Sequence, residues 1–198
     1  MQKTFFSTIL LLLAFYTQAQ TTNINDAAQT NQFLADFLKT APKPVLVAES
    51  LDTGTLAWIK DALSIDTLYR RSTHDGWKTV IVDTFVLHIA EQHYKDSCLN
   101  DMTDFKWTNA LLPGAVILDK YAVDTLKPKG YSAFDYLRTT FATDRFYFFS
   151  KPIFLRDNTV CLFYNETLNM GPIGSSAKIN IFVRKNSQWE SIWAIKKQ

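Results

Sequence analysis

The sequence predicts a single α+β domain over residues 26–198, with helices in the N-terminal half and an antiparallel β-meander in the C-terminal half. Two observations about order along the chain carry this prediction. Apolar residues recur at helical spacing before residue 141, whereas short apolar runs separated by turn residues follow residue 145. A third observation is composition: hydrophobic residues make up 47% of the chain and charged residues 20%, which is typical of a folded globular protein.

The helices are predicted from apolar residues three or four positions apart. Such pairs indicate a first helix over 26–40, which two prolines separate from a short strand at 45–48. Apolar residues at i, i+3 and i+7 indicate a second helix that begins near Asp52 or Thr53. The apolar residues of segment 131–141 lie on or near one side of a helix, which is therefore predicted there.

The segment that follows the turn His74-Asp75-Gly76 has two interpretations. Val80-Ile81-Val82 is typical of a strand. Asp83-Thr84 then has the residue types of a helix N-terminus, and the favoured interpretation is a helix from there to about Ser97. The alternative is that the strand continues through Val86, because the whole segment is rich in strand-forming residues.

The second half of the chain contains four predicted strands, after a short apolar run at 115–118. They are Phe146–Phe149, Val160–Tyr164, Ile179–Val183 and Gln188–Ile195. Short links rich in turn residues favour an antiparallel meander. Strict alternation in the last strand places four residues on one face: Trp189, Ser191, Trp193 and Ile195.

Residues 1–19 have the pattern of a secretory signal peptide. A basic start and an apolar run at 5–16 precede a small residue, Ala19, after which cleavage before Gln20 is expected. The run is shorter than the roughly 20 apolar residues that a transmembrane helix needs, so no membrane anchor is expected in the mature chain. Residues 20–25 are then a flexible leader, and the expected location is periplasmic or secreted.

Short motifs in the C-terminal half resemble a family. They are Ser150-Lys151-Pro152-Ile153-Phe154 at a strand start, Gly171 and Gly174 in a hairpin, and Gln188-Trp189 in the last strand. Together they are similar to a group of uncharacterised secreted bacterial proteins with a Ser-x-Pro-x-Phe strand start, a glycine-containing hairpin and a final strand that bears Trp. The hairpin here lacks the cysteines that members often carry. The resemblance implies secretion and a meander, and it implies no activity or site residue.

Charge and glycine pattern exclude several kinds of partner and cofactor. Twenty-one Lys and Arg against nineteen Asp and Glu give a formal charge of +2, so nucleic acid is not an expected partner. The six glycines are isolated from one another and form no phosphate loop or dinucleotide fingerprint. We therefore expect no cofactor.

Two weak candidate sites involve metal ligands and cysteines. His88 and Glu91 lie about 60° apart around a helix and are the candidate metal ligands, but His93 points elsewhere, a metal site would need further ligands, and a solvated helix face is the favoured interpretation. Cys98 and Cys161 are the two cysteines of the chain. An oxidising compartment permits a disulfide between them, and two separate buried thiols are the alternative.

The residues that carry function are not identified by any catalytic motif. No nucleophile elbow or His-Glu-x-x-His motif is present, whereas aromatic residues are abundant: fifteen Phe, eight Tyr and five Trp. We therefore expect a non-catalytic exported module that binds an unknown ligand or protein partner through a groove beside the meander. The alternative is an exported hydrolase that uses carboxylates or an unrecognised metal site. The sequence leaves the oligomeric state open.

Overall fold

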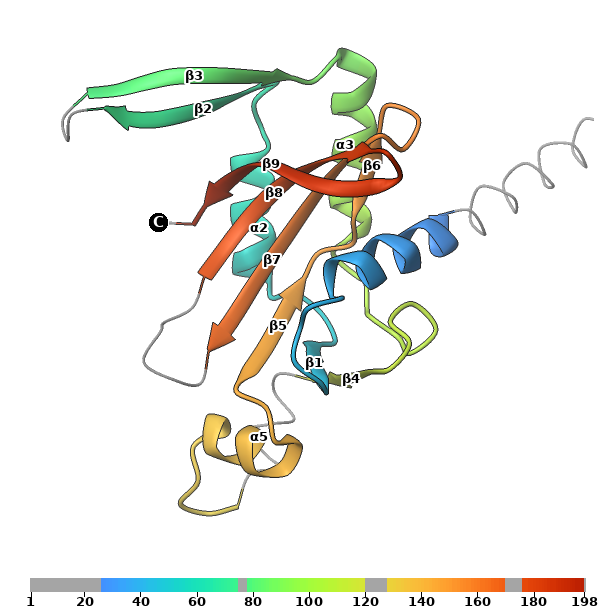
Figure 1. The fold of residues 1–198 in the computed structure, drawn as a ribbon, viewed down its shortest axis with the longest axis vertical. Helices are drawn as coiled ribbons and strands as arrows, with labels where there is room; N and C mark the ends of the chain where they lie inside the picture. Colours follow the sequence, from blue (N-terminus) through green and yellow to red (C-terminus); the bar gives the residue numbers. More distant parts are fainter. Residues whose placement is uncertain (1–25, 75–77, 120–127, 170–175, 198) are drawn as a thin grey trace, which may run out of the picture. The chain divides into compact units, whose positions relative to one another are not determined.

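A computed structural model describes residues 26–74, 78–119, 128–169 and 176–197 (Figure 1), and gives the backbone alone at 69–74, 78–83 and 134. The predicted signal peptide and leader lie outside these residues, as do Asp75 and Gly76 of the predicted turn and the two hairpin glycines. None of the described helices is both long enough and apolar enough to cross a membrane.

The chain divides into two compact units, one up to Lys39 and one from Thr40 onward. The first contains a helix over 26–37, which confirms the helix predicted there. Phe33 and Phe37 are one helical turn apart, and their rings stack with centroids 6.1 Å apart. Whether 26–198 folds as one domain stays a prediction.

The second unit is built on a seven-stranded sheet in the order β4-β1-β5-β7-β8-β9, with β6 also paired to β7 (Figure 1). The strands are β1 (Val45–Ala48), β4 (Ala115–Leu118), β5 (Arg145–Phe149), β6 (Ile153–Leu155), β7 (Val160–Asn169), β8 (Ser176–Lys185) and β9 (Gln188–Lys196). From β5 to β9 all neighbouring strands are antiparallel, which confirms the predicted meander. Strands β4 and β1 are parallel to β5, so the sheet as a whole is mixed.

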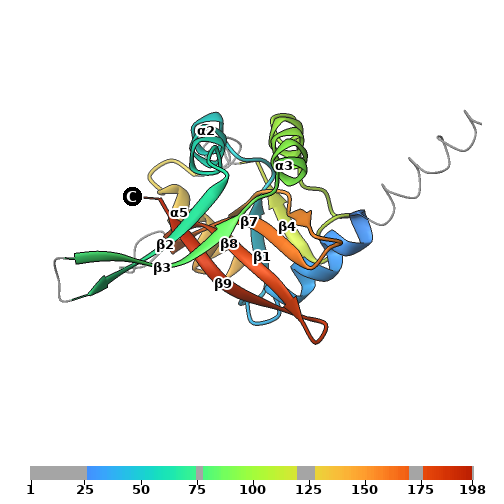
Figure 2. The same cartoon turned by 90° about the horizontal axis from the view of Figure 1, so that it is seen from above.

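Helices α2 (Thr53–Ala62) and α3 (Ile89–Asp101) lie side by side over one face of this sheet (Figure 2). Helix α2 begins at Thr53 because the Asp52 Oδ1 accepts a hydrogen bond of 2.8 Å from the Thr55 N–H, which satisfies one of the unpaired donors of the first turn. The core between the helices and the sheet includes Leu46, Leu56, Ile59, Leu99, Phe148, Leu162 and Ile181. Burial of each such side chain contributes about 1.5–3 kcal/mol to folding.

Helix α5 (Ala133–Phe141) confirms the helix predicted before the meander. It begins after Ser132, whose hydroxyl accepts a hydrogen bond of 3.0 Å from the Asp135 N–H. It ends at Ala142, where the backbone turns into the left-handed region with φ of 52°. Among the side chains described in α5, Leu137 is buried in the core, and Tyr136 and Phe141 pack against it.

The favoured interpretation of Asp83-Thr84 as a helix start is wrong, and the alternative is confirmed. Strand β3 (Lys78–Val86) continues through these residues and pairs antiparallel with β2 (Thr67–His74), so that Asp83 lies opposite Arg70. The helix start lies further along the chain, because Glu91 Oε2 accepts a hydrogen bond of 2.9 Å from the His88 N–H and caps α3 there.

The alternation predicted for the last strand is also wrong. The register between β8 and β9 shifts between Ile181 and Phe182, which leaves Ile192 as an extra residue in a β-bulge. An extra residue moves the following side chains to the other face. Trp189 and Trp193, predicted to share a face, therefore lie on opposite faces of the sheet.

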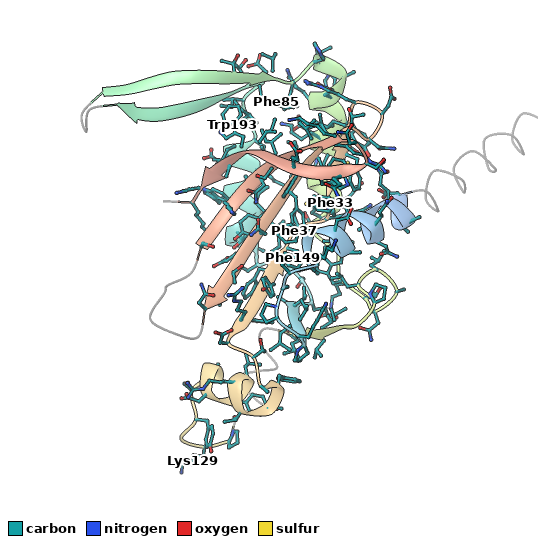
Figure 3. All side chains as sticks on the ribbon, in the orientation of Figure 1. Phe33, Phe37, Phe85, Lys129, Phe149 and Trp193 are labelled. Carbon is teal, nitrogen blue, oxygen red and sulfur yellow. The ribbon has the colours of Figure 1, made fainter. Side chains whose placement is uncertain are left out.

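The β2–β3 hairpin forms a separate two-stranded sheet that extends away from the seven-stranded sheet in both views (Figures 1 and 2). Its base belongs to the core, since Leu68 and Phe85 are buried there. Figure 3 places Phe85 where the hairpin joins the rest of the unit. The Leu87 N–H donates a hydrogen bond of 2.7 Å to the Asp66 carbonyl and closes this base.

Candidate binding site

Tyr164 of β7 places a hydroxyl group on the sheet face that α2 covers. Its ring meets the Trp58 ring of α2 edge-to-face, with centroids 5.8 Å apart. Its hydroxyl donates a hydrogen bond of 2.6 Å to Glu166 Oε2 and is also hydrogen-bonded to the Thr55 hydroxyl. Tyr164 is only 1% exposed, so these bonds replace the water that its hydroxyl loses on folding.

The surroundings of Tyr164 keep its hydroxyl protonated. Burial raises the pKa of Tyr164 far above its ordinary value of 10.0, and the carboxylates of Glu166 and Asp52 raise this pKa further. The hydrogen bond with Thr55 has the opposite and smaller effect. Tyr164 is therefore a permanent hydrogen-bond donor, and it holds the Glu166 carboxylate in one position.

The sheet register brings a basic residue toward the same place. Glu166 of β7 lies opposite Ala177 of β8, and the Lys197 N–H donates a hydrogen bond of 3.0 Å to the Ala177 carbonyl. Glu166 of β7, Ala177 of β8 and Lys197, the residue after β9, thus form one row, with their side chains on the same face. Because adjacent strands are about 4.8 Å apart, the two charged residues are about 10 Å apart at the backbone, with a small side chain between them.

The side chain of Lys197 reaches the aromatic ring. Its Nζ lies 5.7 Å from the centroid of the Trp58 ring, within the range of a cation–π contact. Lys197 is exposed, whereas Trp58 and Glu166 are half-buried. We call this group the Trp58 site; its members are Asp52, Thr55, Trp58, Tyr164, Glu166, Ala177 and Lys197. An aromatic ring that packs on a tyrosine holding a carboxylate is chemically suited to a positively charged group.

The predicted metal ligands, His88 and Glu91, lie outside the Trp58 site. Glu91 forms an ion pair with Arg156, whose Nε donates to Glu91 Oε1 over 2.9 Å and whose Nη2 donates to the Val86 carbonyl over 2.7 Å. The guanidinium also lies 4.5 Å from the centroid of the Phe85 ring. We call these contacts, with the His88 N–H that Glu91 also binds, the Arg156 junction.

The contacts of Glu91 in the Arg156 junction indicate that this residue has a structural role. Partial burial by itself raises the pKa of Glu91, but the hydrogen bonds from Arg156 and from the His88 N–H, with the positive charge of Arg156, outweigh it and lower this pKa. Across the described residues, no three His, Cys, Asp or Glu side chains come together where they could hold a metal ion. The pair His88 and Glu91 thus lacks further ligands in this part of the chain.

Cys98 and Cys161 are not joined by a disulfide in this structure. Cys98 of α3 packs against the core between the helices and the sheet. Cys161 alternates along β7 with Val160 and Leu162, which belong to that core, so it points to the opposite face of the sheet. Burial raises the pKa of the Cys161 thiol well above its ordinary value. The disulfide stays a prediction that this arrangement does not favour.

A shallow hollow lies where β1 and β5 end. It has essentially no enclosed space for a water molecule, and its lining residues are Leu51, Met102, Phe105, Phe149, Ser150 and Lys151. Pockets for small molecules usually measure about 300–1,000 Å³, so this hollow is too small for most ligands. The groove predicted beside the meander therefore stays a prediction, and the Trp58 site is the better candidate.

Comparison of the chain with protein-family models, with curated proteins and with solved structures finds no match. The resemblance to secreted bacterial proteins accordingly stays a prediction.

Sequence reasoning did not single out Trp58, Tyr164, Glu166 or Lys197 as site residues. One local signal was present, because Tyr164 and Glu166 are two positions apart on a strand and so share a face. No sequence pattern links them to Trp58 or to Lys197, which come together only through sheet register and the packing of α2.

Proposed function

We propose that this chain is an exported, non-catalytic binding module and that its Trp58 site takes a positively charged group, such as an amine, of a ligand or protein partner. Export is supported by the signal-peptide pattern of residues 1–19. The observation that carries the binding proposal is Lys197, whose ammonium group lies over the Trp58 ring on the face where Tyr164 holds the Glu166 carboxylate.

Lys197 occupies the position that a ligand amine would take. A cation–π contact at an exposed position is worth only about 0.5–1 kcal/mol, so an incoming amine can displace Lys197 at small cost. The incoming group gains contact with the Trp58 ring and a charge-assisted hydrogen bond to Glu166, whose carboxylate accepts several hydrogen bonds at once. Tyr164 keeps that carboxylate in place before the ligand arrives, which reduces the entropy lost on binding.

The test is a titration of the protein, purified after export to a bacterial periplasm, with the blocked tripeptide acetyl-Gly-Lys-Gly-amide, followed by the NMR signals of the Trp indole N–H groups. One charged group supports an affinity in the millimolar range. We expect Lys197→Ala to strengthen binding about two- to fivefold, since it removes the resident cation. Glu166→Gln should weaken binding about tenfold, because it removes the negative charge.

Two matched controls sharpen this test. Lys196→Ala removes the same charge from the neighbouring position, which lies opposite Lys178 on the other face, and should leave the affinity unchanged. Acetyl-Gly-Glu-Gly-amide should not bind. Weaker binding of the lysine peptide to Lys197→Ala, or preference for the glutamate peptide, would show that the site selects anions and would overturn the proposal.

A carboxylate hydrolase is a second candidate, favoured by the effect of two carboxylates, those of Asp52 and Glu166, on the pKa of Tyr164. Two carboxylates flanking a bond are the machinery of glycoside cleavage. Chromogenic glycosides measure this directly. Turnover that Glu166→Gln abolishes and Glu190→Gln preserves would establish the hydrolase in place of the binding module.

A further inference from the structure

The β2–β3 hairpin, which we call the arm, is joined to the rest of its unit at its base. Leu68 and Phe85 are buried in the core there, and the Leu87 N–H donates to the Asp66 carbonyl. Within the described residues, the strands of the arm pair with each other and with no strand of the seven-stranded sheet. The contacts at the base therefore determine the direction in which the arm extends in Figures 1 and 2.

Arg156 is the side chain that fastens this base from outside the arm. It lies in the turn between β6 and β7, and its Nη2 donates a hydrogen bond of 2.7 Å to the carbonyl of Val86, the last residue of the arm. Its guanidinium lies 4.5 Å from the centroid of the preceding ring, that of Phe85. The ion pair of 2.9 Å with Glu91 holds the guanidinium in this position.

The turn that carries Arg156 has a strained backbone. Arg156, Asp157 and Asn158 are three consecutive residues with positive φ, at 53°, 50° and 65°. Side chains disfavour this left-handed conformation, which persists only where surrounding contacts hold it. Within the turn, the Thr159 N–H and hydroxyl donate to the Arg156 carbonyl over 3.0 and 2.7 Å. The Arg156 side chain adds support at the junction, so the turn and the arm hold each other in place.

We propose that the Arg156 junction is a latch that fixes the direction of the arm, and that the arm swings about its base when the latch opens. Leu68, which is 1% exposed, stays in the core as the pivot. The Arg156 side chain is 37% exposed and that of Glu91 13%, so water replaces their hydrogen bonds in the open state while the seven-stranded sheet stays intact.

The charge of Glu91 keeps the latch closed. In the described part of the chain, the titratable groups that act on Glu91 are Arg156 and His88. A neutral side chain at position 91 leaves the Arg156 guanidinium without its charged partner, and the bond to Val86 then loses its fixed donor. The latch therefore opens when this one charge is removed.

The test measures residual dipolar couplings of the backbone amides in the full exported protein, which report how closely the arm keeps one direction relative to the sheet. Order parameters of about 0.85 are expected in the wild type for the arm and for β7 and β8 alike. Arg156→Met keeps an apolar chain beside Phe85 but removes the guanidinium, and the arm values should fall below about 0.6 while those of β7 and β8 stay unchanged. Glu91→Gln should cause a smaller fall of the same kind, and it decides the test if Arg156→Met does not fold.

Lys185→Met is the matched control, because it removes another exposed ion pair, of 3.0 Å to Glu190, at the turn between β8 and β9. It should leave the arm values unchanged. Arm values that stay at the wild-type level in both junction variants would overturn the proposal.

A bend within the arm is the competing arrangement. The register of the arm shifts between Arg70 and Arg71, which leaves Val82 as an extra residue in a β-bulge. Low order in the wild type that is confined to residues beyond this bulge would place the hinge there and also overturn the latch. Because the variants leave every member of the Trp58 site unchanged, lysine-tripeptide binding tests the proposed function independently.

Discussion

The Arg156 junction and the Trp58 site use the same three components, yet they differ in how these are connected. Each has a cation over an aromatic ring and a glutamate close by. At the junction the Arg156 guanidinium lies 4.5 Å from its ring centroid and bonds directly to Glu91. At the Trp58 site the Lys197 ammonium lies 5.7 Å from the centroid of the Trp58 ring. There Glu166 accepts a hydrogen bond of 2.6 Å from the Tyr164 hydroxyl.

The partner of the carboxylate decides the role of each group. At the junction, Arg156 of the same chain bonds to the Glu91 carboxylate. These contacts connect the end of β3, the start of α3 and the turn after β6. Where a neutral hydroxyl holds the carboxylate, its negative charge remains to attract a cation from elsewhere. We therefore expect mutations at the junction to change stability most, and mutations at the Trp58 site to change binding most.

The largest expected effect is that of Arg156→Ala on the free energy of unfolding. It removes the ion pair to Glu91, the bond to the Val86 carbonyl and the contact with the Phe85 ring, and we expect a loss of about 2–3 kcal/mol in urea unfolding. Arg156→Gly should lose about 1 kcal/mol less, since Arg156 has a φ of 53°, which favours glycine.

Arg184→Ala is the matched control for this experiment, because Arg184 also lies over a ring, that of Trp189, at 6.0 Å. We expect it to cost less than about 1 kcal/mol. Equal losses for Arg156→Ala and Arg184→Ala would contradict the role assigned to the junction.

A smaller effect is expected from Tyr164→Phe. The change preserves the ring contact with Trp58 but removes the donor to Glu166, so we expect a loss of about 1 kcal/mol in the free energy of unfolding. Lysine-peptide binding should weaken as well, because Glu166 is no longer held in place. Tyr147→Phe, which changes a buried tyrosine of β5, serves as the control; unchanged peptide affinity in Tyr164→Phe would argue against a positioning role for Tyr164.

The smallest expected effect is a pH dependence at the junction. The folded protein lowers the pKa of Glu91 below its ordinary value of 4.5, so the ionised carboxylate stabilises the fold above that pH. This contribution is lost as the pH falls through the lowered pKa. The difference in melting temperature between wild type and Glu91→Gln should therefore shrink between neutral pH and a pH well below 4.5. A difference that stays constant across that range would disprove the linkage.

The sequence predicted the elements whose signals are local. The meander strands and α2 follow from apolar runs, turn residues and the cap at Asp52, all within a few positions of one another. The errors arose where a local signal competed with pairing. Asp83-Thr84 resembles a helix start, but Asp83 lies opposite Arg70 in the hairpin ladder, and ladder hydrogen bonds outweigh a capping preference.

The candidate site depends on positions that are distant in the sequence. Trp58 and Glu166 are separated by more than half of the chain and come together through the packing of α2 on the sheet. The bulge at Ile192 is a similar case, since a single extra residue reverses which face each later side chain occupies. Hydrophobic period alone carries no information about such registers.

Strand β1 has a consequence for the order in which the protein folds. Its four residues are all buried, and both of its neighbours come much later in the chain: Leu46 lies beside Val116 on one side and Phe146 on the other. Contacts of such long range close slowly, whereas the hairpins β7–β8 and β8–β9 join neighbours that follow each other directly. During synthesis β1 emerges early and stays unpaired at least until β4 exists. The hairpins that are made last therefore close fastest, whereas β1, next to the edge strand β4, depends on the slower long-range contacts.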